Sequence, residues 1–169
     1  MTAHDYEASV LFKQNYSSGA HVVVNQGGTS SGKTYAIVQV LFCLAGEAEN
    51  QVITVVGQDI PNLKAGALRD ALSIYNKSAR LKNLIKNYNK TDRIFEFHNG
   101  SVIEFKSYAN PQDAKSGKRD YLFINEGLII IQRQGKILLL YSKEIIKFSF
   151  RKILFINKLN NPYNQLINY

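Results

Sequence analysis

One glycine- and serine-rich segment constrains the fold of this chain more than any other feature. Residues 27–34 read GGTSSGKT and match the spacing G-x-x-x-x-G-K-[ST]. The β-branched run HVVVN before the segment is typical of a buried parallel strand, and KTYAIVQVLFCLA behind it has apolar residues at helical spacing. Strand, loop and helix in this order form the context in which the spacing binds phosphate. The sequence therefore predicts an α/β fold with a phosphate-binding loop, of the Walker A kind, at residues 27–34.

The residue types in this loop suit the chemistry of a nucleoside triphosphate. Glycines let the backbone wrap closely, so that its N–H groups point inward at the β-phosphate. Lys33 would reach the β- and γ-phosphates as a catalytic point charge, and the Thr34 hydroxyl would bind Mg²⁺. The predicted nucleotide-binding residues are Gly27, Gly28, Thr29, Ser30, Ser31, Gly32, Lys33 and Thr34.

Patterns further along the chain predict a second strand, a helix and a hairpin. Residues 51–57, QVITVVG, read as a buried strand, and Pro61 suits the first turn of a helix that runs to about Tyr75. After a basic, Asn-rich connector, KNLIKNYNK, apolar residues alternate on both sides of Asn99-Gly100, which indicates a hairpin. A strict two-residue turn would pair Phe95 with Glu104. We prefer a three-residue loop with Gly100 left-handed, which pairs Phe95 with Ile103.

The segment DYLFINEG predicts the strand that lies beside the phosphate loop, with a Walker B-like end. Residues 121–124 are apolar, and Asn125-Glu126 follow them at the carboxyl edge, where ligands of parallel sheets bind. Such a strand end supplies one Mg²⁺ ligand and, in one branch of these enzymes, a Glu that polarises the attacking water. Asn125 can offer Mg²⁺ a carbonyl oxygen but no charge, so Glu126 is the predicted general base. The alternative is an ordinary edge strand followed by a polar turn.

Composition bounds the class of protein. A chain of 169 residues with 45% apolar residues suits one domain with a core, and no run is long enough to span a membrane. The first ten residues lack the features of a signal peptide, and the single Cys43 excludes an internal disulfide, so we expect a cytoplasmic protein. The net charge of +8 suggests an anionic partner. However, residues 128–169 hold seven Lys/Arg and one acid, against 14 and 12 in residues 1–127.

Three segments, in this order and spacing, resemble the ATPase domain of the phage terminase large subunit: NQGGTSSGKTYAI, FEFHNGSVIEFKSY and SGKRDYLFINE. The resemblance covers roughly residues 5–127. It implies a three-layer P-loop NTPase of the RecA-like, additional-strand, catalytic-Glu branch, with a mainly parallel sheet and a β-hairpin insertion. It also implies that ATP and Mg²⁺ drive the packaging of double-stranded DNA into procapsids in the host cytoplasm. The implied partners are the portal, the small terminase subunit and further copies of the chain in a ring.

Three departures from the family pattern affect these expectations. Many members carry an Arg inside the phosphate loop, whereas this loop has none, so a charge-stabilising Arg would come from Arg119 or from a neighbouring subunit. Asn125 replaces the usual Asp. The family also continues with a coupling motif and a nuclease domain that holds two metal ions with a cluster of acids. Behind Glu126 this chain has only Glu144, so we expect the nuclease domain to be absent.

The last quarter of the chain differs in composition from the rest. Residues 128–169 contain no Ala, Val, Thr or Asp and are dominated by Ile, Leu, Lys and Asn. We interpret them as an out-of-frame or truncated tail behind an incomplete ATPase domain at residues 1–127. The alternative is a genuine strand-rich end in which KILLLY and KILFIN form buried strands. In the resembled fold a strand inserts between the phosphate-loop strand and the Glu126 strand, and we expect at most one tail run to join the sheet.

Two other functions remain open from the sequence. A helicase- or recombinase-like ATPase of the same branch would show further Arg-bearing motifs downstream, and none is recognisable. A non-catalytic DNA-binding fragment would use the basic tail and would bind DNA without ATP.

Overall fold

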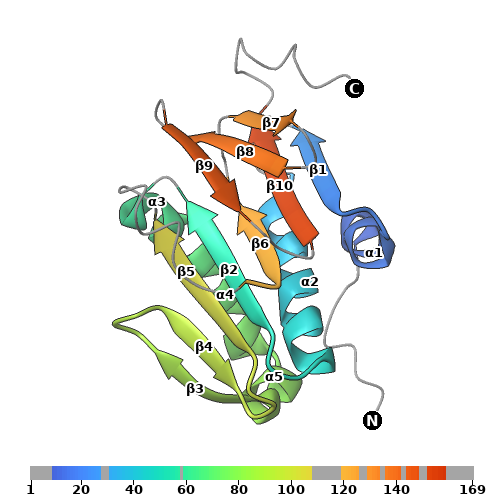
Figure 1. Ribbon diagram of the computed structural model, residues 1–169. Helices are drawn as coiled ribbons and strands as arrows, with labels where there is room; N and C mark the ends of the chain where they lie inside the picture. The colour runs from blue at the N-terminus through green and yellow to red at the C-terminus, as the bar shows by residue number, and fades with distance from the viewer. Residues whose placement is uncertain are drawn as a thin grey trace.

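The main sheet has seven strands in the order β1-β10-β6-β2-β5-β4-β3 (Figure 1). The computed structural model describes residues 9–27, 31–57, 59–107, 119–125, 129–133, 136–141, 144–148 and 152–158, and from residue 129 onward it describes the backbone only. The strands of this sheet are β1 (Val22–Gly27), β2 (Val52–Gly57), β3 (Ile85–Asn89), β4 (Ile94–Phe97), β5 (Val102–Ser107), β6 (Tyr121–Ile124) and β10 (Lys152–Lys158).

Five neighbouring strands of this sheet are parallel, as the sequence predicted. β10 lies between β1 and β6, and β2 lies between β6 and β5, each pair being parallel. β4 and β3 complete the sheet as antiparallel strands. In the hairpin of β4 and β5, Phe95 pairs with Ile103 and Gly100 has φ 82°, so the predicted three-residue register is confirmed. The predicted bounds of β6 are confirmed as well.

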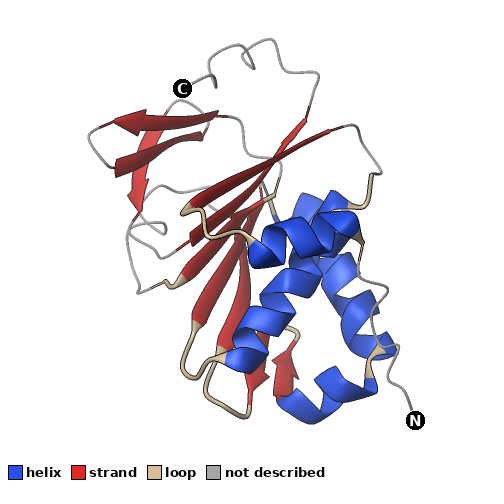
Figure 2. Cartoon of the chain, turned by 90° about the vertical axis from the view of Figure 1, so that its right-hand side faces the viewer, coloured by secondary structure: helices blue, strands red, loops and turns tan. Residues whose placement is uncertain are grey.

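The helices lie on one face of the sheet, which corrects the expectation of three layers. They are α1 (Val10–Ser17), α2 (Lys33–Glu47), α3 (Ile60–Ala65), α4 (Ala67–Lys77) and α5 (Ala79–Leu84). Figure 2 shows them on the same side of the strands. The connections from β1 to β2 and from β2 to β5 cross the sheet in the same direction, and right-handed crossovers in one direction place their helices on one face. Within the described residues the architecture is therefore two-layered.

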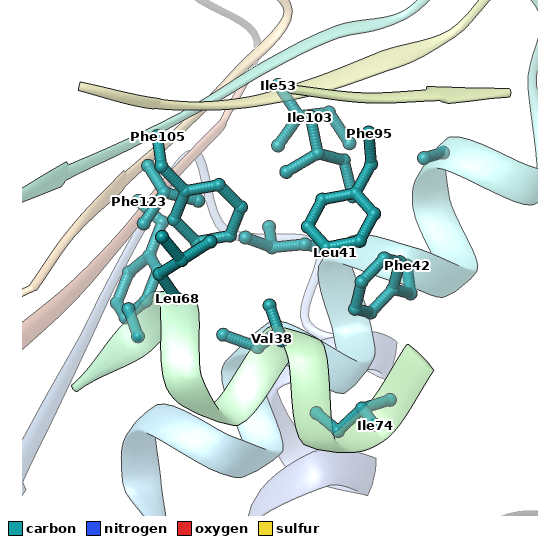
Figure 3. Close-up of a cluster of buried hydrophobic side chains, with 14 of the residues drawn as sticks. Val38, Leu41, Phe42, Ile53, Leu68, Ile74, Phe95, Ile103, Phe105 and Phe123 are labelled. Carbon is teal, nitrogen blue, oxygen red and sulfur yellow. The ribbon is translucent and has the colours of Figure 1, made fainter. Parts of the chain in front are cut away.

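The core fills the space between this helical layer and the sheet (Figure 3). Helix α2 is buried along most of its length because it packs against both the sheet and α4. Phe95 of β4 contacts Phe42 of α2 edge to face, with ring centroids 5.3 Å apart, and it stacks on Tyr88 of β3 at 4.4 Å. These contacts tie the hairpin to the helix that follows the phosphate loop. The buried residues shown in Figure 3 include Val38, Leu41, Ile53, Leu68, Ile74, Ile103, Phe105 and Phe123.

The helix predicted from Pro61 to about Tyr75 is present as two helices, α3 and α4, separated at Gly66. Asp59 caps the first of them, because its carboxylate accepts a hydrogen bond from the N–H of Asn62 at 2.7 Å. The basic connector is structured too: it contains most of α5 and all of β3.

The tail contributes four strands, one of which joins the main sheet. β10 takes the position between β1 and β6, so the expectation that at most one tail run joins that sheet is confirmed. The others, β7 (Ile129–Arg133), β8 (Lys136–Tyr141) and β9 (Glu144–Phe148), form a separate antiparallel sheet. That sheet lies on the side of the main sheet away from the helices (Figures 1 and 2). No helix in the described part of the chain is both long and apolar enough to cross a membrane.

Candidate active site

The junction of the predicted phosphate loop with α2 carries a left-handed glycine. Gly32 has φ 74° and is the N-cap of α2, and its carbonyl accepts the first helical hydrogen bond, from Ala36 N–H at 3.0 Å. A side chain at this φ would be strained, so the turn into the helix favours glycine. The N–H groups of the first helical turn have no partners within the helix, and an anion placed there would be stabilised by them and by the helix dipole.

Lys33 is held close to this junction. Its side chain is only 7% exposed, and its ammonium donates a hydrogen bond to the Ser31 hydroxyl at 2.6 Å. A lysine held against a turn of backbone N–H groups gives a compact region of positive potential. A phosphate group has the charge and the acceptor oxygens that such a region stabilises.

Thr34 and Asn125 bring the two predicted motifs together, although 91 positions separate them in sequence. The Thr34 hydroxyl donates to Oδ1 of Asn125 at 3.2 Å. The Asn125 N–H donates to the Val56 carbonyl at 2.8 Å, which extends the pairing of β6 with β2 by one residue and fixes the amide at the carboxyl edge of the sheet. The hydroxyl oxygen and the amide oxygen are both hard ligands of the type that Mg²⁺ prefers, so the residues fit this metal.

Gly66, at the break between α3 and α4, lies against the Asn125 amide. A Cβ added at Gly66 would be 3.5 Å from Nδ2 of Asn125 and 3.2 Å from the Asn62 carbonyl oxygen. The absence of a side chain at Gly66 therefore leaves room for the amide, and the break in the helix has a steric use at the site.

A buried pair of asparagines anchors the end of β1, and the sequence did not reveal it. Asn15 of α1 and Asn25 of β1 are 1% and 7% exposed, and their amides exchange two hydrogen bonds of 2.8 and 2.7 Å. This pair ties α1 to the strand two residues before Gly27. Tyr16 of α1 also donates to Glu47 of α2, and this hydrogen bond raises the pKa of Tyr16. The one available signal was an Asn at the end of an otherwise apolar strand.

The hairpin tip holds the other end of α2. The Asn99 amide donates to the carbonyls of Ala45 and Ala48 at 2.8 and 3.1 Å, and the Ser101 hydroxyl donates to the same Ala48 carbonyl at 2.7 Å. These bonds satisfy carbonyls that a helix end leaves without partners. The asparagine and serine on either side of Gly100, which the sequence marked only as a turn, thus fix the helix that begins at Lys33.

Some predicted site residues are not brought to this site. Arg119 lies just before β6, at the opposite end of the strand from Asn125, and its side chain is 8% exposed. Six residues of extended chain span ~20 Å, so its guanidinium does not reach the Lys33 region of the same chain. Glu126 and the loop residues Gly28, Thr29 and Ser30 lie outside the described residues.

Two further features lie away from this edge of the sheet. A hollow of about 360 Å³ is lined by Tyr16, His21, Leu44, Tyr121 and residues 18–20, at the amino ends of β1 and β6. The half-buried Cys43 lies on α2, and burial raises the pKa of its thiol, which makes it a poor nucleophile at neutral pH. Among the residues that the structure describes, no group of three His, Cys, Asp or Glu could hold a metal ion.

The fold and this edge define a mixed α/β protein whose mainly parallel sheet brings a glycine turn, a lysine and two oxygen ligands together at the carboxyl ends of its strands. No protein-family model and no curated protein matches the chain.

Solved structures identify the kind of α/β protein. The fold is similar to that of the large terminase of bacteriophage HK97, with a TM-score of 0.59 and 13% identity over 88% of this chain and 31% of that one. It is also similar to the ATPase domain of a Thermus phage large terminase (TM-score 0.63, 11% identity, 90% of this chain and 65% of that one). A large terminase from a thermophilic bacteriophage gives 0.61, 10%, 90% and 39%. The resemblance to phage large terminases is thereby confirmed at the level of the fold, and the chain spans about a third to two thirds of their length.

Proposed function

We propose that this chain is the ATP-hydrolysing domain of a phage DNA-packaging motor of the large terminase kind. The observation that carries the proposal is the hydrogen bond between Thr34 and Asn125, because it joins the predicted phosphate loop to the predicted metal-binding strand end. The similarity of the fold to terminase ATPase domains supports the same assignment. So does the strand order, in which one strand, β10, separates β1 from β6 as in the additional-strand branch of P-loop NTPases.

In this proposal each residue of the site has a separate task. The N–H groups of residues 27–34 bind the phosphates, and Lys33 compensates the negative charge of the β- and γ-phosphates. Thr34 and Asn125 would hold Mg²⁺, which supplies charge neutralisation for the phosphoryl group when it is bound. Glu126, the residue after Asn125, would accept a proton from the attacking water. A charge-stabilising arginine would come from another subunit of a homo-oligomeric ring, since Arg119 lies at the far end of β6.

The wider role follows from the same proposal. Hydrolysis would drive double-stranded DNA into procapsids in the host cytoplasm, with the portal and the small terminase subunit as partners. Residues 128–169 hold a single acid, Glu144, and could not supply a two-metal nuclease site. The division into an ATPase domain at residues 1–127 and a tail stays a prediction.

Replacing Glu126 with glutamine should preserve ATP binding and lower ATP turnover by ~10² or more, the scale for loss of a general base. Single-turnover hydrolysis with protein in excess over ATP would detect slow reactions. Glu49→Gln makes the same chemical change at an exposed position between α2 and β2 and should leave the rate unchanged. If Glu126→Gln hydrolyses ATP at the parental rate while Asn125→Ala abolishes turnover, the two roles have been assigned in the wrong order.

Changes at Asn125 should alter the Mg²⁺ requirement of ATP binding. Asn125→Asp adds a charge next to the Thr34 hydroxyl, so we expect the Mg²⁺ concentration for half-maximal binding to fall several-fold. Asn125→Ala removes an oxygen ligand and should raise it. Mg²⁺ titration of a fluorescent ATP analogue measures both effects without turnover. Asn87→Asp adds the same charge on the exposed edge strand β3 and is the matched control. Identical Mg²⁺ curves for all four proteins would exclude Asn125 from the metal site.

A further inference from the structure

The stretch from α5 through β3 forms an exposed basic edge that the proposed ATP site does not use. Residues 77–90 contain five cationic side chains and no Asp or Glu. All five are exposed: Lys77, Arg80, Lys82, Lys86 and Lys90. We call these five residues the basic edge. They lie on the last turn of α4, on α5 and along β3, which is the outermost strand of the main sheet (Figure 1).

Local structure accounts for only part of this charge. Lys77 and Lys82 lie in the last turns of their helices, where a cation complements the helix dipole. Lys86 lies on an edge strand, where a charge discourages pairing with another chain. Arg80, in the first turn of α5, and Lys90, after the end of β3, have neither use. A structural explanation would also allow acids between these residues, and there are none.

The charges of the basic edge are not neutralised by their neighbours. None of the five side chains forms an ion pair with another described residue. The acids nearest along the edge are Glu96, which lies opposite Asn87 in the β3–β4 ladder, and Asp92, which accepts a hydrogen bond from Asn89. Arg93 is not part of the edge, because its guanidinium is bound to backbone carbonyls. Five cations and two acids leave a net positive surface.

The edge has a length that suits a polyanion. α5 supplies six residues at 1.5 Å each and β3 supplies five at about 3.3 Å, so the two cover ~25 Å of chain, or about seven base pairs of duplex at 3.4 Å each. β3 and β1 are at opposite ends of the strand order, so a ligand on the edge would leave the Lys33 site accessible.

We propose that the basic edge binds the phosphate backbone of double-stranded DNA. This inference rests on the proposed function, because it names the surface through which the motor domain holds the polymer that it moves. The flexible lysines and the four asparagines of residues 76–89 can contact phosphate oxygens of any sequence. Binding of this kind is sequence-independent and strongly dependent on salt, as a moving contact requires.

The test is the salt dependence of duplex binding by the complete 169-residue chain. Fluorescence anisotropy with a labelled 20-base-pair duplex gives the slope of log K against log salt concentration. In the variant Lys82→Gln/Lys86→Gln/Lys90→Gln three phosphate contacts are lost, so the slope should become shallower by about 2.7 and the affinity at 50 mM salt should fall at least ~10-fold. The exposed pair Lys13→Gln/Lys64→Gln removes cations elsewhere and should leave the slope unchanged.

Other outcomes separate this inference from the proposed function. The triple variant should bind Mg·ATP as the parent does, and Lys33→Ala should bind the duplex normally without nucleotide. If the parent fails to bind ATP but the triple variant loses the salt slope, the edge stands and the ATPase assignment falls. An unchanged slope in a variant with a normal circular dichroism spectrum would overturn the inference, and would do so whether the tail then carries the DNA binding or the edge proves to hold a protein partner in sedimentation experiments.

Discussion

Replacing Lys33 with alanine is expected to remove Mg·ATP binding from this protein. In the proposed site the ammonium would make charge-assisted hydrogen bonds to the β- and γ-phosphates, each contributing ~1.5–3 kcal/mol. Two such bonds correspond to a loss in affinity of about 10²–10⁴. The side chain is 7% exposed and bonded to Ser31, so it is positioned before any ligand arrives. Calorimetric titration with ATP and Mg²⁺ measures the change.

The Lys33→Ala result needs a control for folding, because the side chain is buried. The circular dichroism spectrum and the melting temperature should stay close to those of the parent. Lys13→Ala, on the exposed side of α1, removes the same charge at a distance and should keep the parental affinity. Equal ATP affinity in Lys33→Ala and the parent would exclude residues 27–34 as a phosphate-binding loop.

Replacing Gly100 with alanine is expected to destabilise the fold by about 3 kcal/mol, from two causes. Gly100 has φ 82°, where an L residue costs ~1–2 kcal/mol. A Cβ at this position would also collide with Oδ1 of Asn50, in the loop between α2 and β2. Forcing an extra carbon into a filled space costs a further ~1–3 kcal/mol. Urea unfolding of the parent and the variant measures the difference in the free energy of unfolding.

A second substitution separates the two causes. Asn50 has φ 55°, so Asn50→Gly keeps its backbone geometry and removes the side chain that the new Cβ would meet. Relative to Asn50→Gly alone, the double variant Asn50→Gly/Gly100→Ala should lose only the ~1–2 kcal/mol that the left-handed backbone costs. An equal loss with and without Asn50 would show that the hairpin tip does not pack against the loop that follows α2.

The parts of the fold that could be predicted from sequence are those that short-range chemistry determines. The phosphate-loop context needs a strand, a glycine turn and a helix in immediate succession, and each is visible in residues 21–45. The hairpin register followed from Asn99-Gly100, because Gly100 alone accommodates the left-handed position without strain. β6 followed from four apolar residues that end in polar ones.

The parts that could not be predicted depend on contacts between distant segments. Residues 82–90 read as a connector because they are basic and Asn-rich, yet they include β3, which pairs with β4 and places Tyr88 on Phe95. α1 has few strongly apolar positions, and its packing on α2 and the bond from Asn15 to Asn25 stabilise it. The position of Arg119 at the wrong end of β6 is likewise a property of the sheet and not of the motif.

The candidate site divides along the same line. The residue types at positions 32–34 and 125 predicted the chemistry, and their meeting through Thr34 and Asn125 required the fold. The contact between Asn125 and Gly66 had no signal in the sequence, because a glycine within a helical pattern has many causes. The anchoring of both ends of the loop–helix unit, by Asn25 and by Asn99, was equally invisible.

The most direct test of the ATPase assignment is a crystal structure of the chain with Mg²⁺ and a non-hydrolysable ATP analogue. We expect the β-phosphate to lie against the N–H groups of residues 27–34, with Lys33 on the β- and γ-phosphates. The metal should be bound by the Thr34 hydroxyl, with the Asn125 amide on it or on its water shell. A nucleotide bound elsewhere on the protein, or a metal ion that contacts neither Thr34 nor Asn125, would contradict the assignment.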